Sequence, residues 1–119
     1  MVSRGRDPQL PSVFAETVLD LVAGIPTGRA VSYGDVARWL GRGGPRQVGA
    51  VMAAFGDGVP WWRVVRADGT AAPAIAVEAG RRWRSEGTPT LSKGRRVDLA
   101  RARWEGPAEV SGARGTHDL

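Results

Sequence analysis

The sequence predicts a small, mainly α-helical domain of the winged helix-turn-helix class, and three observations carry that prediction. Apolar residues recur at intervals of three and four in three segments between residues 13 and 55, which is the spacing of a buried helix face. Glycine and proline separate these segments, and a short Gly-rich turn joins the second to the third. An Asp-Gly pair after residue 65 lies between β-prone residues and predicts a small wing.

The first helix is expected over residues 13–23. Ser12 is a favourable N-cap, and Gly24 followed by Pro26 ends the helix because neither residue continues it well. The apolar residues of this segment fall on one face, which we assign to the core. They are Phe14, Val18, Leu21 and Val22.

Two shorter helices follow and form the helix-turn-helix. Ser32 followed by Asp35 matches a capping box at the start of the second helix, which Gly41 stops. Pro45 is favoured at the first position of the third helix, because its fixed backbone angle suits a helix start. The apolar positions expected to face inward are Val36, Ala37, Leu40, Val48, Val51, Met52 and Phe55.

The second half of the chain is less regular. A weakly amphipathic fourth helix is expected over residues 75–85, with Gly80 inside it and Gly87 after its end. Residues 93–99 then close the domain near Trp104.

Length and composition favour a single domain. The chain has 119 residues, of which 42% are hydrophobic, and its ends lack apolar periodicity. We therefore expect one folded unit at residues 12–104, with flexible tails at residues 1–11 and 105–119. No apolar run approaches the roughly 20 residues that cross a bilayer, and residues 1–6 lack an apolar signal segment. We expect a cytoplasmic protein that does not bind membranes.

Cysteine and histidine are nearly absent from the chain. It has no cysteine and a single histidine, His117. Disulfides, thiolate metal sites and a sulfur nucleophile are therefore excluded, and one histidine leaves little basis for a zinc site or a histidine-based triad. We expect no metal ion and no cofactor.

The charge of the chain is basic. Seventeen Lys and Arg against twelve Asp and Glu give a formal net charge of +5, and every cation except Lys93 is an arginine. The planar fork of arginine suits phosphates and base edges. A charge of this size permits nucleic-acid binding without proving it, since compositional drift towards Arg, Ala and Gly also produces it.

The start of the third helix is the candidate DNA-binding element. In a helix-turn-helix the first residues of the second helix of the pair reach furthest into a groove, and Arg46 occupies that place. Arg42 adds a charge on the loop, and the backbone N–H groups up to Gln47 can receive a phosphate. Tyr33 faces the same DNA backbone. A plain packing unit with a solvated turn accounts for these residues equally well.

The outer face of the third helix is small and nearly uncharged. Gly49 and three alanines alternate with its core positions, whereas major-groove readers generally present Asn, Gln, Arg or Ser there. Small residues favour close approach to a minor groove, with Arg46 as an inserted wedge. The alternative for Arg46 is a phosphate contact or an exposed cation at a helix start.

Two adjacent tryptophans, Trp61 and Trp62, follow Pro60. If this segment is extended, their side chains point to opposite faces, so that one ring enters the core and the other lines a cavity. A flipped base needs such a cavity, and stacking on an aromatic ring contributes about 1–3 kcal/mol, comparable with the cost of unstacking the base. From the residues alone, the favoured alternative is that both indoles belong to the core.

Several segments in order resemble one family. They are residues 25–37, which include Ser32-Tyr33-Gly34-Asp35, residues 46–49 (Arg-Gln-Val-Gly), residues 60–65 (Pro-Trp-Trp-Arg-Val-Val), Glu86-Gly87, and residues 96–99 with Trp104. Together they are similar to the DNA-binding domain of the O6-alkylguanine-DNA alkyltransferases. The resemblance covers residues 12–104 and implies the winged helix-turn-helix of that family's C-terminal domain.

The resemblance breaks at the active-site motif. In the alkyltransferases this motif reads Pro-Cys-His-Arg, where the cysteine accepts the alkyl group and the histidine helps to deprotonate it; here Trp61 and Trp62 stand at those two positions. An indole neither attacks an alkyl carbon nor serves as a base at neutral pH, so alkyl transfer is excluded at this site. The chain resembles instead the alkyltransferase-like proteins, which bind the lesion without repairing it. Trp62 is not expected to make the hydrogen bonds of the histidine it replaces.

The resemblance also implies roles for the matching residues. Arg46 corresponds to the arginine finger that enters through the minor groove and fills the space left by the extruded base, and Tyr33 to the tyrosine that turns the phosphate of that nucleotide. Trp61 borders the lesion pocket. The expected DNA contacts are Tyr33, Arg46, Ser32, Gln47, Gly49 and Arg42, and the expected pocket residues are Trp61, Tyr33 and Val64.

The resulting hypothesis is a monomeric, non-enzymatic sensor of O6-alkylguanine in double-stranded DNA. It flips the damaged base and flags it for nucleotide excision repair proteins, in the cytoplasm and at the nucleoid when bound to DNA. The main alternative is a sequence-specific winged-helix regulator, which reads the major groove and needs no pocket. An alkyltransferase or glycosylase that acts through some other residue is the enzymatic alternative.

Overall fold

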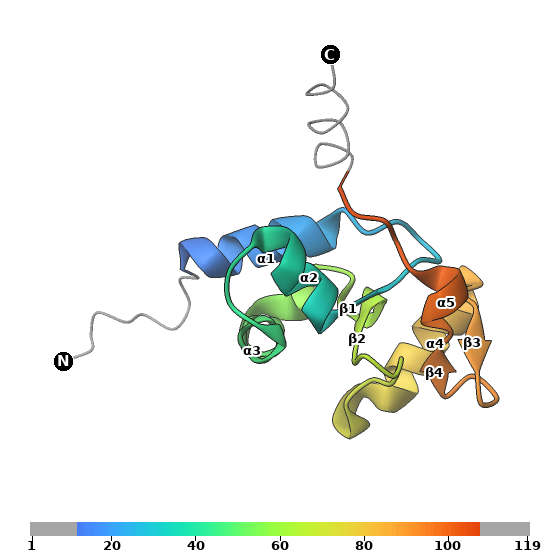
Figure 1. Cartoon of the computed structure of the whole chain (residues 1–119). Coiled ribbons are helices and arrows are strands. Elements are labelled where there is room, and N and C mark those ends of the chain that lie inside the picture. Colours follow the sequence, from blue (N-terminus) through green and yellow to red (C-terminus); the bar gives the residue numbers. More distant parts are fainter. Residues whose placement is uncertain (1–11, 108–119) are drawn as a thin grey trace, which may run out of the picture.

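The first helix begins and ends at the residues that the capping signals indicate. The computed structural model of the chain describes residues 12–107 (Figure 1). Helix α1 (Val13–Ala23) starts after Ser12, whose hydroxyl accepts a hydrogen bond from the Ala15 N–H. Gly24 follows its last residue. The local sequence therefore predicts α1 without help from its neighbours in space.

Helices α2 (Tyr33–Leu40) and α3 (Pro45–Phe55) form the expected helix-turn-helix. Ser32 and Asp35 complete a capping box at the start of α2, because each side chain accepts a hydrogen bond from the other residue's backbone N–H. Gly41 ends α2 in the left-handed conformation, with φ 72°, which glycine adopts without steric penalty.

Helices α1, α2 and α3 enclose the first of two apolar cores. Phe14, Leu21, Leu40 and Phe55, which we expect to face inward, are partly buried around its edge. The buried members are Ala15, Val18, Val22, Ile25, Val31, Val36, Ala37, Val48, Val51, Met52 and Val64.

A second core lies on the other side of the molecule, beside the three-helix group (Figure 1). It is enclosed by α4 (Ala76–Glu86), α5 (Leu99–Ala102) and an antiparallel pair of strands, β3 (Thr90–Leu91) and β4 (Arg96–Val97). Helix α4 lies within one residue of its expected bounds at each end. The buried members of this core are Ala30, Val65, Ala79, Trp83, Val97, Leu99 and Ala102.

The β-hairpin forms at β3–β4 and not at the Asp-Gly pair. Gly69 does close a tight turn there, since its N–H donates to the Arg66 carbonyl. The preceding strand β2 (Val64–Val65), however, pairs in parallel with β1 (Val31–Ser32). The Val97 N–H donates to the Gly69 carbonyl, and a Cβ on Gly69 would collide with the Val97 carbonyl oxygen. Gly69 is therefore packed against β4, and the turn does not join two strands of a hairpin.

A buried carboxylate of the three-helix group also contacts the segment that follows α5. Asp35, buried in α2, accepts hydrogen bonds from Arg38 and, at 3.0 Å, from Arg103 Nε. Burial alone would raise the pKa of Asp35, but the Ser32 N–H, Arg38 and Arg103 together hold it below its usual value. This carboxylate thus ties α2 to the segment that follows α5.

Packing continues past Trp104, where we expect the folded unit to end. Gly106 is buried against the ring of Trp39, which itself meets Trp104 edge-on. The expected N-terminal tail, residues 1–11, and residues 108–119 of the expected C-terminal tail lie outside the described residues. Within residues 12–107, no helix is long and apolar enough to cross a membrane.

Candidate nucleic-acid interface

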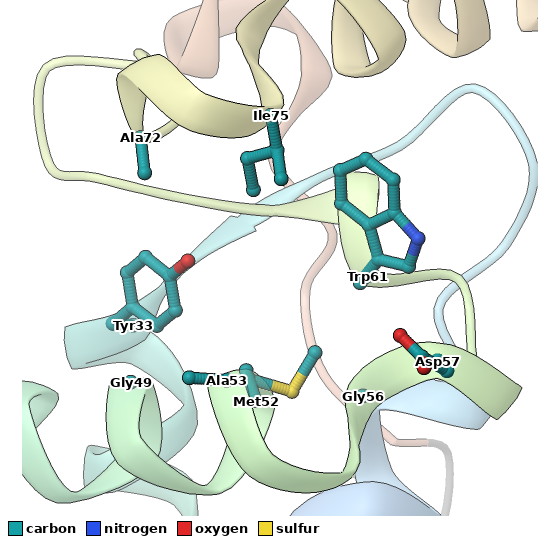
Figure 2. Close-up of a pocket in the computed structure, with 9 residues that line it drawn as sticks. All are labelled: Tyr33, Gly49, Met52, Ala53, Gly56, Asp57, Trp61, Ala72 and Ile75. Carbon is teal, nitrogen blue, oxygen red and sulfur yellow. The ribbon is translucent and has the colours of Figure 1, made fainter.

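A pocket opens between α3 and the segments that follow it. Its cavity volume is about 470 Å³, within the range of about 300–1,000 Å³ typical of ligand sites. Figure 2 shows α3 along one side, with Trp61 and the segment that holds Ala72 and Ile75 facing it across the space. The lining residues are Tyr33, Gly49, Met52, Ala53, Gly56, Asp57, Trp61, Ala72 and Ile75.

The α3 wall of the pocket contains two of the small residues noted in the sequence, Gly49 and Ala53, together with the core residue Met52. Gly49, Met52 and Ala53 line the cavity, and they lie on one side of the helix because three or four residues make one turn. A Cβ added to Gly49 would meet no atom within 4 Å. Helix packing therefore does not require glycine at this position, and its effect is to leave space in the pocket wall.

Arg46 lies one helical turn from that wall. It is the second residue of α3 and is exposed, three residues before Gly49, which is about 4.5 Å along the helix axis. Among residues 12–107, no side chain forms an ion pair with Arg46. The guanidinium is therefore available to an external partner next to the mouth of the pocket.

Gln47 and Arg42 are exposed near the same turn, and each also contacts the protein. Gln47 Oε1 accepts a hydrogen bond from the Gly44 N–H at 2.9 Å, which caps α3. The Arg42 guanidinium carbon lies 5.5 Å from the centre of the Phe14 ring. Both residues remain exposed.

Two of the expected site residues are buried and contribute to the fold. Ser32, expected to contact DNA, is buried, and its hydroxyl is engaged in capping α2. Val64, expected in the lesion pocket, is 3% exposed, belongs to the first core and pairs with Val31. The first prediction fails because the cap uses the hydroxyl, and the second because β2 turns Val64 into the core and away from the cavity.

The two adjacent indoles diverge, although not because the chain is extended. Trp61–Arg63 forms a 3₁₀ turn, in which successive side chains point about 120° apart. The rings of Trp61 and Trp62 lie edge to face, with centres 5.6 Å apart and planes at 86°. Trp61 packs against both cores and also lines the pocket, whereas Trp62 packs against the second core and does not line the pocket. The alternative in which both indoles are purely core residues therefore does not hold for Trp61.

Trp62 makes a side-chain hydrogen bond that the sequence does not lead us to expect. Its indole N–H donates to Glu86 Oε2 at 2.7 Å, and the Arg82 guanidinium lies 4.3 Å from the centre of its ring. The indole supplies this donor but has no acceptor nitrogen, so it cannot take up a proton as an imidazole does.

Glu86 connects three segments through hydrogen bonds, a role that the sequence did not predict. Its carboxylate also accepts hydrogen bonds from Arg63, at 2.6 Å, and from the Gly28 N–H, at 3.0 Å. Burial alone would raise the pKa of Glu86, but Arg63, Gly28 and Trp62 outweigh it and lower the pKa. One signal pointed to it: an acidic residue in the last turn of a helix opposes the helix dipole and needs a partner.

Tyr33 occupies the end of the pocket away from Trp61, with its hydroxyl directed towards the cavity (Figure 2). Burial raises the pKa of this hydroxyl, and the positive charge of Arg66 partly offsets the rise. The hydroxyl therefore stays protonated at neutral pH and can donate a hydrogen bond. Within the described residues, no three His, Cys, Asp or Glu side chains come together as a metal site.

Comparison with known proteins finds a matching family of DNA-binding domains and two similar proteins. The family described as "6-O-methylguanine DNA methyltransferase, DNA binding domain" matches residues 13–87. A DNA base-flipping protein of Escherichia coli K12 is 37% identical over 98 residues, which are 76% of this chain and 74% of that protein. The DNA base-flipping protein of Shigella flexneri matches to the same extent.

Two solved structures have the same fold. One is S. pombe Atl1 in complex with damaged DNA containing O6-carboxymethylguanine, with a TM-score of 0.67 and 31% identity over 77% of this chain and 94% of that one. The other is S. pombe ATL in complex with DNA, with a TM-score of 0.65 and the same identity and coverage.

Proposed function

The chain belongs to the family of the 6-O-methylguanine DNA methyltransferase DNA-binding domain, as an alkyltransferase-like protein, and from this premise we propose that it is a non-enzymatic sensor of O6-alkylguanine in DNA. One observation carries the proposal. An accessible arginine, Arg46, lies one turn from a pocket that is bordered by Trp61, at the position where the alkyltransferases have their cysteine.

The proposed binding mode follows from the surface of α3. The small residues allow α3 to approach a minor groove closely, and Arg46 enters the base stack there. The extruded base then occupies the pocket between Tyr33 and Trp61. An O6-alkylguanine pairs poorly and is cheaper to extrude than guanine, so selectivity begins before any contact with the alkyl group. Phosphate contacts make the affinity fall with salt.

The proposed absence of catalysis follows from side-chain chemistry. The chain has no cysteine, and Trp61 has no lone pair able to attack an alkyl carbon. Trp62 donates to Glu86 but cannot accept a proton. Because the lesion survives, the bound monomer would serve as a mark that nucleotide excision repair proteins recognise in the cytoplasm.

Binding competition tests the proposal. A duplex with one O6-methylguanine should compete about tenfold or more better than the same unmodified duplex. A sequence-specific regulator would instead discriminate among unmodified duplexes. Mass spectrometry of both components after incubation should find the methyl group still on the DNA. Equal affinity for the two duplexes, or a methylated polypeptide, would contradict the proposal.

A further inference from the structure

The pocket carries a single charged side chain among its described lining residues, and that side chain is acidic. Asp57 lies in the 3₁₀ turn Gly56–Gly58, directly after α3, and is exposed at the rim. Within residues 12–107, no Lys or Arg forms an ion pair with it. Its negative charge is therefore not neutralised by the protein.

The backbone around Asp57 is held in place beside Trp61. The Val59 N–H donates to the Gly56 carbonyl at 3.1 Å, and the Trp61 N–H donates to the Val59 carbonyl at 2.7 Å. A Cβ on Gly56 would lie 3.3 Å from the end of the Met52 side chain, so the turn is packed on α3. Asp57 therefore has a defined position at the pocket.

The two ends of the pocket differ in their electrostatic surroundings. Figure 2 shows Asp57 next to Trp61, with Tyr33 at the far end. The positive charge of Arg66 acts on the Tyr33 hydroxyl. A phosphate on the Tyr33 side would thus meet positive charge, whereas a group beside Trp61 meets a carboxylate.

We propose that Asp57 makes this pocket selective for O6-alkyl groups that are neutral or cationic, and disfavours adducts that end in a carboxylate. This inference rests on the proposed function, because it assigns the adduct class to the same pocket. A carboxylate on the adduct would be repelled by Asp57, whereas a hydroxyl, an amide or an ammonium group can donate a hydrogen bond to it. The chain should therefore differ from the S. pombe relative, which was crystallised with a carboxymethyl adduct.

The test uses two adducts of nearly the same shape. O6-carboxymethylguanine and O6-carbamoylmethylguanine differ in charge and hardly in size. At low salt the wild-type protein should bind the carbamoylmethyl duplex about threefold to tenfold more tightly. Asp57→Asn, which preserves the shape of the side chain, should bring the two affinities within about twofold of each other. Asp20→Asn removes an equal charge from the exposed surface of α1 and should leave the ratio unchanged.

The outcomes separate this inference from the proposed function. Equal binding of the two adducts by wild-type protein, or an unchanged ratio in Asp57→Asn, would overturn the role of Asp57 even if O6-methylguanine is still preferred over guanine. If the methyl lesion is not preferred at all, the proposed function fails, and this inference fails with it.

Discussion

Helices α3 (Pro45–Phe55) and α4 (Ala76–Glu86) have the same length and a glycine in the middle, yet they present opposite surfaces. The outer face of α3 is small and carries one charge, Arg46, which has no ion-pair partner among the described residues. The outer face of α4 is densely charged. Its arginines are largely engaged, because Arg81 and Arg82 both pair with Glu78, and Arg82 also covers the ring of Trp62.

The comparison shows that the helix with more arginines is not the better candidate for DNA. The charges of α4 hold Trp62 and its neighbours together, whereas α3 leaves both its cation and the space beside it available. An interface is better recognised by groups that the fold does not use than by the number of its arginines. Substitutions on the two helices test this distinction.

Removing Glu86 should cause the largest loss of stability. In Glu86→Ala the Arg63 side chain, 14% exposed beside an 11% exposed carboxylate, loses its ion-pair partner and keeps its hydrogen bonds to Ile25 and Thr27. We expect the free energy of unfolding, measured in urea, to fall by about 2–4 kcal/mol. Glu78→Ala is the matched control, because Glu78 pairs with two arginines but is 44% exposed. That variant should lose less than about 1 kcal/mol. Equal losses of unfolding free energy in the two variants would contradict the structural role that we assign to Glu86.

Removing Arg46 should affect binding and not stability. Arg46→Ala should weaken binding to an O6-methylguanine duplex by about 1–3 kcal/mol, while the free energy of unfolding changes by less than about 0.5 kcal/mol. Arg84→Ala removes another exposed arginine, from α4, and serves as the charge-matched control, read out by fluorescence anisotropy. If both variants lose the same affinity, Arg46 acts only through its charge and not as a wedge.

The two central glycines offer a smaller and finer test. Gly49→Ala and Gly80→Ala should each stabilise the protein by about 0.5–1 kcal/mol, because alanine favours a helix. Neither change produces a clash: a Cβ on Gly49 meets open space, and one on Gly80 lies 3.9 Å from the Gly94 carbonyl oxygen. Only Gly49→Ala should weaken lesion binding, since its methyl group enters the pocket wall. Unaltered binding by Gly49→Ala would mean that this face does not approach DNA closely.

The pH dependence near neutrality is the smallest effect we expect. The pKa of Glu86 is lowered on folding from its usual value of 4.5, so its stabilising contribution is complete above that value and is lost as the pH falls through the lowered pKa. The pKa of Asp35 is lowered as well, with the same sign. Thermal melting temperatures should be flat from neutral pH to about 5.5 and then fall. Glu86→Gln should show a shallower fall, and an unchanged slope would count against the lowered pKa.

Local signals in the sequence predict the first half of the fold and the outline of the site. Ser12, Ser32 and Gly41 act within a few residues of their own positions, so they place α1 and α2 without knowledge of the tertiary structure. Helical periodicity predicts in the same way that Arg46, Gly49 and Ala53 lie along one side of α3. Trp61 lines a pocket as its resemblance to the alkyltransferase-like proteins implies.

What the sequence does not predict depends on contacts between distant segments. The parallel pairing of β1 with β2 buries Val64, and Gly69 packs on β4 instead of closing a hairpin between two strands. The links from Glu86 to Gly28 and Arg63 span 58 and 23 residues of sequence. Asp57 acquires its place in the pocket only because the turn after α3 folds back towards Trp61.

The central claim is that the pocket beside Trp61 receives the damaged base, and tryptophan fluorescence tests it most directly. At saturation with an O6-methylguanine duplex, the emission of the five tryptophans should fall in the wild-type protein, because the base stacks near one of them. In Trp61→Phe most of this quenching should disappear, while anisotropy of a labelled duplex confirms that the DNA is bound. Unchanged wild-type emission at saturation, or equal quenching in Trp61→Phe, would contradict the account.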